Sequence, residues 1–128
     1  MKNSRQMLLS RMTEILENKL SLLAGILELT KQQAESFKPD ALDQLEKIIA
    51  DKQALIDKIN HLDEEFGTLF TQLKGEYDFV NLGQAEASGF GELREKIKAV
   101  TDLISEIHSY EESNSKKAKE LMERIKDD

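Results

Sequence analysis

The stretch LREKIKAVTDLISEIHSYEESNSKKAKELMERI, residues 93–125, decides the fold class of this chain. Its apolar side chains recur alternately three and four residues apart, which is the spacing of one face of an α-helix. Two polar residues interrupt that face. The full stripe is Leu93, Ile97, Val100, Ile104, Ile107, Glu111, Asn114, Ala118, Leu121 and Ile125. We expect a long helix at about 93–126 whose inner half is buried and whose outer half is left partly free for another chain.

Two further stretches show the same spacing. They predict helices at about 3–36 and 40–74, separated near Pro39 because the residue before a proline is pushed out of the helical region. A connection this short makes the two helices antiparallel neighbours. The first helix carries two adjoining apolar stripes, so its face is wide enough to touch two other helices. The sequence therefore predicts a single all-α domain, an elongated bundle in which a long antiparallel hairpin packs with a third long helix.

Residues 75–92 break the helical pattern. They hold four of the six glycines of the chain and a set of apolar residues, Tyr77, Phe79, Val80, Leu82 and Phe90. Connections longer than about 12 to 15 residues are usually functional or disordered. Two interpretations remain open: these apolar residues cover the open end of the hairpin, or they contact a partner.

The composition argues against several classes of function. A net charge of −7 disfavours binding to nucleic acid or to acidic membrane surfaces, since both need a basic surface. The chain has no cysteine, which excludes disulfides and thiolate chemistry. No window approaches the ~20 apolar residues of a membrane-spanning helix. The N-terminus leads into an amphipathic pattern instead of a signal peptide, so we expect a cytoplasmic protein without membrane insertion.

Signals for catalysis are weak. His61 lies one helical turn from Glu65, and His108 lies one turn from Glu111 or Glu112, so either histidine offers at most a partial metal site. Di-iron bundles need a Glu-x-x-His motif on each of two helices, and the chain lacks that arrangement. It also lacks a glycine-rich phosphate loop and a nucleophile with a nearby base. We predict that the protein is not an enzyme and has no catalytic, metal-binding or cofactor-binding residues.

A family resemblance enters at residues 27–60, LELTKQQAESFKPDALDQLEKIIADKQALIDKIN. In the FlgN family of flagellar export chaperones, a Leu-rich and Gln/Glu-rich helix end is followed by a short acidic break. A second helix then opens with Leu-x-x-Leu, an acidic-Lys pair and paired apolar residues. This chain resembles that pattern with Leu42 and Leu45, Asp51 and Lys52, and Leu55 and Ile56. Its length, acidity and extended third helix agree over the whole chain.

The resemblance implies a cytoplasmic chaperone of flagellar type III protein export. Such a protein would bind the C-terminal segments of hook-filament junction proteins, also called hook-associated proteins, and deliver them to the export gate. The substrate-binding arm of the family would fall on residues 93–126. The partner-binding residues that we predict on this arm are Val100, Ile104, Ile107, Tyr110, Glu111, Asn114, Ala118, Leu121 and Ile125.

One alternative is a self-associating helical scaffold or coiled-coil adaptor without an export role. Its third helix would be buried in a homodimer, with Glu111 and Asn114 as polar positions that set the register. In the chaperone interpretation, the same two residues keep the outer half of the helix from collapsing permanently onto itself or onto a second copy. Replacing both with leucine would then raise helicity or oligomerisation.

Overall fold

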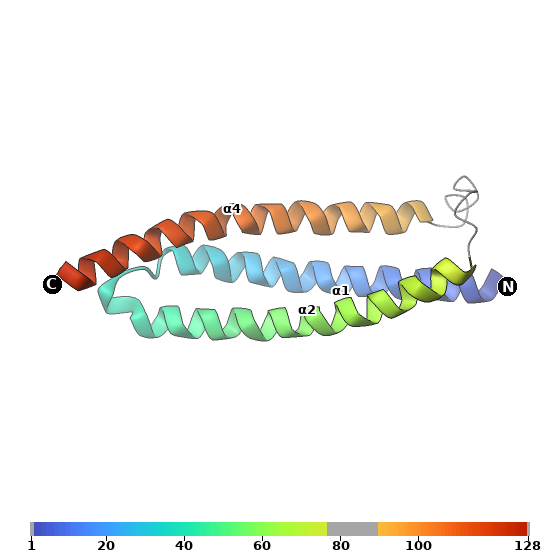
Figure 1. Cartoon of the computed structure of the whole chain (residues 1–128), viewed down its shortest axis with the longest axis horizontal. Helices are drawn as coiled ribbons and strands as arrows, with labels where there is room; N and C mark the ends of the chain where they lie inside the picture. Colours follow the sequence, from blue (N-terminus) through green and yellow to red (C-terminus); the bar gives the residue numbers. More distant parts are fainter. Residues whose placement is uncertain (1, 77–89, 128) are drawn as a thin grey trace.

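The computed structural model describes residues 2–76 and 90–127, and all of its regular structure there is helical. The elements are α1 (Lys2–Ala34), a short 3₁₀ helix η1 (Pro39–Ala41), α2 (Leu42–Glu76) and α4 (Gly91–Asp127). α1 and α4 run in the same direction and α2 runs in the opposite one, so the two termini lie at opposite ends (Figure 1). The predicted all-α bundle of three long helices is confirmed.

The break between α1 and α2 lies at the predicted place. The last turn of α1 closes with backbone hydrogen bonds from Glu35 to Gln32 (3.1 Å) and from Ser36 to Gln33 (2.9 Å). Lys38 is extended (φ −138°, ψ 147°), as expected for a residue before proline. α2 begins at Leu42, not at 40 as expected, because the residues after Lys38 first form η1.

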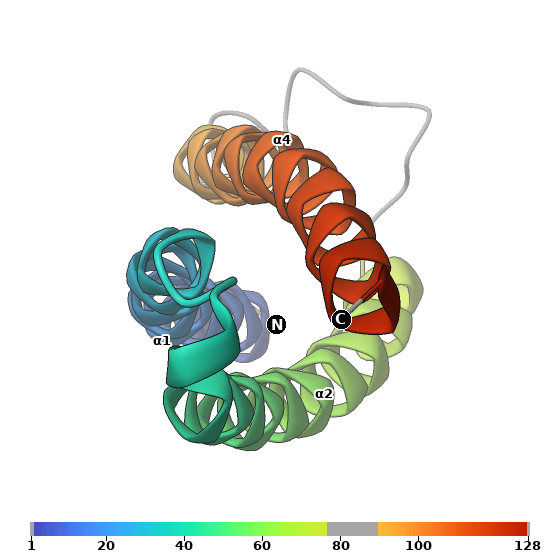
Figure 2. The ribbon, with the colours of Figure 1, turned by 90° about the vertical axis from the view of Figure 1, so that its left-hand side faces the viewer.

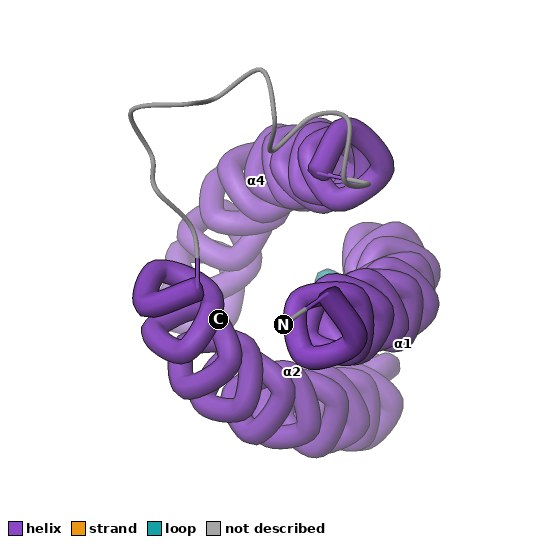
Figure 3. The backbone as a smooth tube through the Cα atoms, turned by 90° about the vertical axis from the view of Figure 1, so that its right-hand side faces the viewer, coloured by secondary structure: helices purple, strands orange, loops and turns teal. Residues whose placement is uncertain are grey.

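α1 is the central helix of the bundle. It packs against both α2 and α4, whereas α2 and α4 scarcely contact each other. Views along the bundle show α2 and α4 on different sides of α1 (Figures 2 and 3). This arrangement follows from the wide apolar face of α1, because a helix with two adjoining stripes buries one against each neighbour.

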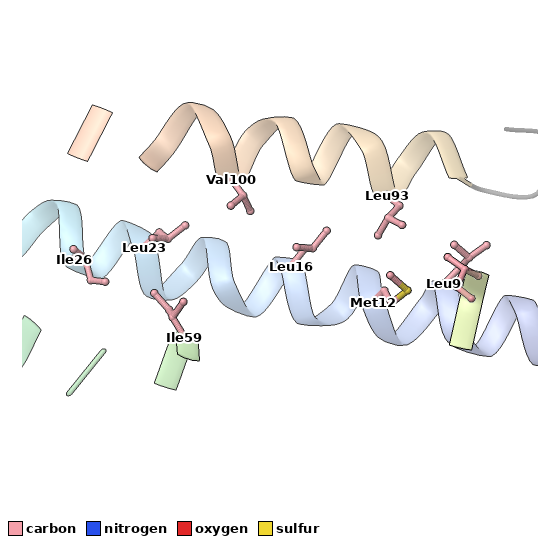
Figure 4. Packing of buried hydrophobic residues seen from close by; sticks show 9 residues of the cluster. Leu9, Met12, Leu16, Leu23, Ile26, Ile59, Leu93 and Val100 are labelled. Carbon is pink, nitrogen blue, oxygen red and sulfur yellow. The ribbon is translucent and has the colours of Figure 1, made fainter. Parts of the chain in front are cut away.

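The apolar core lies along the two interfaces of α1. Side chains from α4 and α2 converge on α1 in the close view, where Leu93 and Val100 approach from one side and Ile59 from the other (Figure 4). The buried apolar residues are Leu9, Met12, Ile15, Leu16, Leu23 and Ile26 of α1, Ile48, Ile59 and Leu73 of α2, and Leu93, Val100 and Leu121 of α4. Each such side chain contributes roughly 1.5–3 kcal/mol when fully buried, so these interfaces supply most of the stabilisation.

Polar contacts join α1 to α2 at the edge of this core. Arg11 Nε and Nη2 donate to the two carboxylate oxygens of Glu65 at 2.6 and 2.8 Å. Hydrogen bonding to Arg11 lowers the pKa of Glu65, and the same bond raises the pKa of Arg11. Lys19, eight residues after Arg11 on α1, donates through Nζ to Asp63 at 2.7 Å. Both pairs are partly exposed to solvent, so each contributes less to stability than the apolar core.

Most of the connection predicted at 75–92 lies outside the described residues. The two interpretations of Tyr77, Phe79, Val80 and Leu82, a cover for the hairpin or a partner contact, therefore stay predictions. Phe90, at the end of the connection, is described and packs against the core. α2 extends the helical pattern as far as Glu76. None of the helices in the two described segments is long and apolar enough to cross a membrane.

Candidate functional site

The surface between α2 and α4 contains two neighbouring hollows, which we call the inner and outer hollows and, together, the groove. Their volumes are about 670 Å³ and about 350 Å³. The apolar lining of the inner hollow is Leu23, Ile26, Ile49, Ile56, Ile59, Ile104 and Ile107. The apolar lining of the outer hollow is Phe37, Leu42, Leu45, Ile49, Ala118, Leu121, Met122 and Ile125. The groove exists because both flanking helices pack on α1 and leave the space between themselves unfilled.

The α2 wall of the groove carries apolar side chains at intervals of seven residues. Leu42, Ile49 and Ile56 are exposed by 43%, 50% and 36%. A seven-residue interval returns to nearly the same side of a helix, so the three form one stripe along α2. The stripe is therefore apolar surface that the described residues leave partly uncovered.

The α4 wall matches this spacing. Ile104 and Ile125, each 45% exposed, stand three heptads apart, and Glu111 and Ala118 occupy the positions between them. α2 and α4 run in opposite directions, so Leu42 lies at the end of the groove occupied by Ile125, in the outer hollow. Two facing stripes at heptad spacing form the kind of surface on which an additional helix packs.

An ion pair crosses the groove between its two halves. Lys52 of α2 forms a salt bridge with Glu111 of α4, and its Nζ also donates to Gln33 Oε1 of α1 at 2.8 Å. Lys52 is only 8% exposed, whereas 40% of the Glu111 side chain is accessible. The pair thus links all three helices through one buried ammonium group and one half-exposed carboxylate.

The second polar residue of the α4 stripe is buried. Asn114 Nδ2 donates to the Thr30 carbonyl oxygen at 3.0 Å, which ties the outer part of α4 to α1. The Thr30 hydroxyl lies 2.7 Å from the Ile26 carbonyl oxygen and 3.3 Å from Glu111 Oε1, and its single proton serves one of them at a time. Asn114 Oδ1 is buried without a hydrogen-bond partner among the described residues.

These contacts correct part of the expectation of a third helix with a buried inner half and a partly free outer half. Ile97 and Ile104 of the inner half are 43% and 45% exposed, as is Ile125 of the outer half at 45%. Asn114 and Leu121 are both buried, at 3% and 5% exposure, so packing on the rest of the chain continues past the interruption. The polar residues do not stop the burial because each has a partner: Lys52 for Glu111 and the Thr30 backbone for Asn114. Replacing both with leucine would remove these bonds and leave Lys52 without its carboxylate, so we now expect that change to destabilise the fold.

The predicted partner-binding residues differ in their exposure and in their position relative to the groove. Val100 is buried outside the groove, whereas Asn114 and Leu121 are buried but line the outer hollow. The partly exposed residues that line the groove are Ile104, Ile107, Glu111, Ala118 and Ile125. Tyr110 is partly exposed, with Lys31 Nζ 5.5 Å from its ring centroid. Their role in binding stays a prediction.

The α2 wall was missed at the sequence level. Leu42, Ile49 and Ile56 all belong to apolar stripes of the sequence, and their common interval of seven was a usable signal. The sequence does not indicate that these three residues are exposed, because Leu45 and Ile48 belong to the same apolar face of the predicted helix. The sequence offers Lys52 only as part of the acidic-Lys pair of the family pattern, and the tertiary structure brings it to Glu111.

Neither histidine lines the inner or the outer hollow. His108 Nε2 lies 3.0 Å from Glu112 on the exposed side of α4, and His61 is also exposed. Over residues 2–76 and 90–127, no group of three or more His, Asp or Glu side chains is placed to hold a metal ion.

A family model described as FlgN protein matches residues 7–127. The chain belongs to the FlgN family. The match to FlgN covers α1 from residue 7 onward and all of α2 and α4, and thus both walls of the groove. Membership in the FlgN family indicates a flagellar export chaperone. Neither a curated protein nor a solved structure matches this FlgN chain.

Proposed function

We propose that this protein is a cytoplasmic chaperone of flagellar type III export that binds the C-terminal segments of hook-filament junction proteins and delivers them to the export gate. The groove between α2 and α4 is the observation that carries the proposal. Its occupant is an amphipathic helix formed by the junction-protein segment. No cofactor, metal ion or nucleotide takes part in this function.

The groove suits a helix because of its lining and its spacing. The apolar residues of both walls lie at seven-residue intervals, interrupted on α4 by Glu111, so a helix with leucine-like residues at the same interval packs its side chains between the two walls. Binding would bury Ile49 and Ile104, which the isolated chain leaves half exposed. The complex would then be a four-helix bundle in which the bound helix lies between α2 and α4, opposite α1.

The length of the groove sets the length of the bound segment. Ile104 and Ile125 are 21 residues apart, which corresponds to roughly 32 Å at 1.5 Å per residue. A helical segment of about 20 residues therefore fills both hollows. For a chaperone that must release its substrate, micromolar or tighter affinity is expected, corresponding to about −8 kcal/mol or better.

Binding to a junction-protein tail tests the proposal directly. The full chain is mixed, in the presence of a chelator, with a junction protein or with the same protein lacking its last ~40 residues, enough for one such helix and its flanks. Size-exclusion chromatography with light scattering should show a 1:1 complex with the intact protein and none with the shortened one. Equal binding of both forms would contradict the proposal.

The groove also bears on the alternative of a self-associating scaffold, because a second copy could cover the same apolar stripes. Light scattering on the chain alone separates the two functions. A monomer that forms a complex only with the tail supports the chaperone. A stable dimer that ignores the tail supports the scaffold.

A further inference from the structure

A helix that fills the whole groove must cross the Lys52–Glu111 ion pair. Glu111 and Gln33 line both hollows, and Lys52 lines the inner one. Apolar wall residues lie on either side of this position, with Ile56 and Ile104 in the inner hollow and Leu42 and Ile125 in the outer one. The pair is thus a polar step in the middle of an apolar surface.

The pair has hydrogen-bonding capacity left over. A lysine ammonium carries three protons, and Lys52 donates two of them, to Gln33 and to Glu111. Glu111 accepts through Oε1, and no described residue donates to its Oε2. The ion pair therefore keeps one donor on Lys52 and an acceptor oxygen on Glu111, whose side chain is 40% exposed while the groove is open, and the Gln33 amide nitrogen adds further donors beside them.

A bound helix displaces water from this exposed carboxylate, so its side chain at this position must supply the hydrogen bonds that the water made. An apolar side chain would leave the remaining donor and acceptor buried and unsatisfied. A charged side chain would be buried against a lining with no net charge, because the four charged residues of the inner hollow already form two pairs, Lys19 with Asp63 and Lys52 with Glu111. A carboxamide is uncharged and carries its donor and its acceptor on separate atoms, which matches two neighbouring groups.

We propose that the groove selects helices that carry Asn or Gln at the position facing Lys52 and Glu111, between two stretches of apolar residues. This inference rests on the proposed function and adds a specificity rule to it. Lys52 and Glu111 set the register of the bound helix, because a shift by one heptad would bring an apolar residue onto the pair and move the amide into an apolar hollow.

Four designed peptides test the rule. Each is a labelled amphipathic helix of 21 residues with leucines at heptad spacing, and the four differ only in a central Gln, Leu, Glu or Lys on the apolar face. Fluorescence anisotropy with the full chain should give a Kd for the Gln peptide that is lower than the Kd of each other peptide by about tenfold or more. With the double variant Lys52→Met/Glu111→Leu, which removes the polar step, the Leu peptide should become the tightest binder. A role of the ion pair in folding alone would not reverse this order.

Each outcome decides the proposal. It is overturned if the Leu peptide binds the parent chain as tightly as the Gln peptide, if the double variant keeps the parent order, or if none of the four peptides binds. The parent ranking stands by itself should the double variant fail to fold. A junction-protein tail measured in parallel separates the two levels: a tail that binds while the ranking fails leaves the proposed function intact, and a tail that does not bind refutes that function whatever the peptides do.

Discussion

Removing Glu111 should destabilise the protein more than removing Lys52, although the two form one ion pair. Glu111→Leu leaves the ammonium of Lys52, at 8% exposure, with Gln33 as its remaining acceptor. Removing one partner of a fully buried pair costs about 3–5 kcal/mol, and partial access of water to this pair lowers our expectation to about 2 kcal/mol. Lys52→Met leaves a carboxylate that is 40% accessible and can be hydrated, so the expected loss is about 1 kcal/mol or less.

The double variant Lys52→Met/Glu111→Leu should lie within about 1 kcal/mol of the parent, because replacing both charges with apolar groups leaves neither unpaired. Urea unfolding followed by far-UV circular dichroism measures all three free energies of unfolding. Lys98→Met is the control: Lys98 pairs with Asp102 on the exposed side of α4, and its loss should change stability by less than about 0.5 kcal/mol. The reasoning fails if Lys52→Met is the more damaging change, or if the double variant loses the sum of the two single effects.

Two further predictions concern positions outside the groove. Gly67→Ala should stabilise the chain by about 1 kcal/mol, because a Cβ at this helical glycine meets no atom within 4 Å. Gly25→Ala should stabilise the chain clearly less than Gly67→Ala, or destabilise it, because its Cβ would lie 3.2 Å from Leu55 Cδ1. Equal gains of the two variants in the free energy of unfolding, measured with urea, would argue against close packing at Gly25. The lowered pKa of Glu65 stabilises the fold at pH values above the ordinary 4.5, and this contribution is lost as the pH falls through the folded-state value. The parent should therefore exceed Glu65→Gln in stability near neutral pH and lose that advantage in acid; a difference that does not change with pH would rule out this linkage.

Much of the fold follows from local pattern. The two adjoining stripes of the first helix predicted that it would touch two neighbours, and α1 does so. Pro39 predicted the break between α1 and α2, because its effect on Lys38 is a property of the backbone alone. Periodicity fails only at helix ends, where the 3₁₀ turn before Leu42 competes with α-helix.

The site was less predictable, because it depends on which apolar positions remain uncovered. Ile48 and Ile49 are neighbours of the same type, yet one is buried and the other is half exposed. The difference arises because α2 and α4 both pack on α1 and stay apart, which no local pattern encodes. Glu111 was correctly singled out as unusual, but its partner is 59 residues away in the chain, so its role became visible only in three dimensions.

The central claim is that a junction-protein tail binds in the groove, and one substitution at its wall tests this most directly. Ile104→Asp places a carboxylate among the apolar residues of the inner hollow, where a bound helix would bury it without a partner. Met7→Asp is the matched control, since Met7 is 72% exposed and lies outside the groove. In isothermal titration calorimetry with the tail, Ile104→Asp should weaken binding by about tenfold or more, while Met7→Asp should bind as the parent does. Parent-like affinity of a folded Ile104→Asp variant would contradict the account.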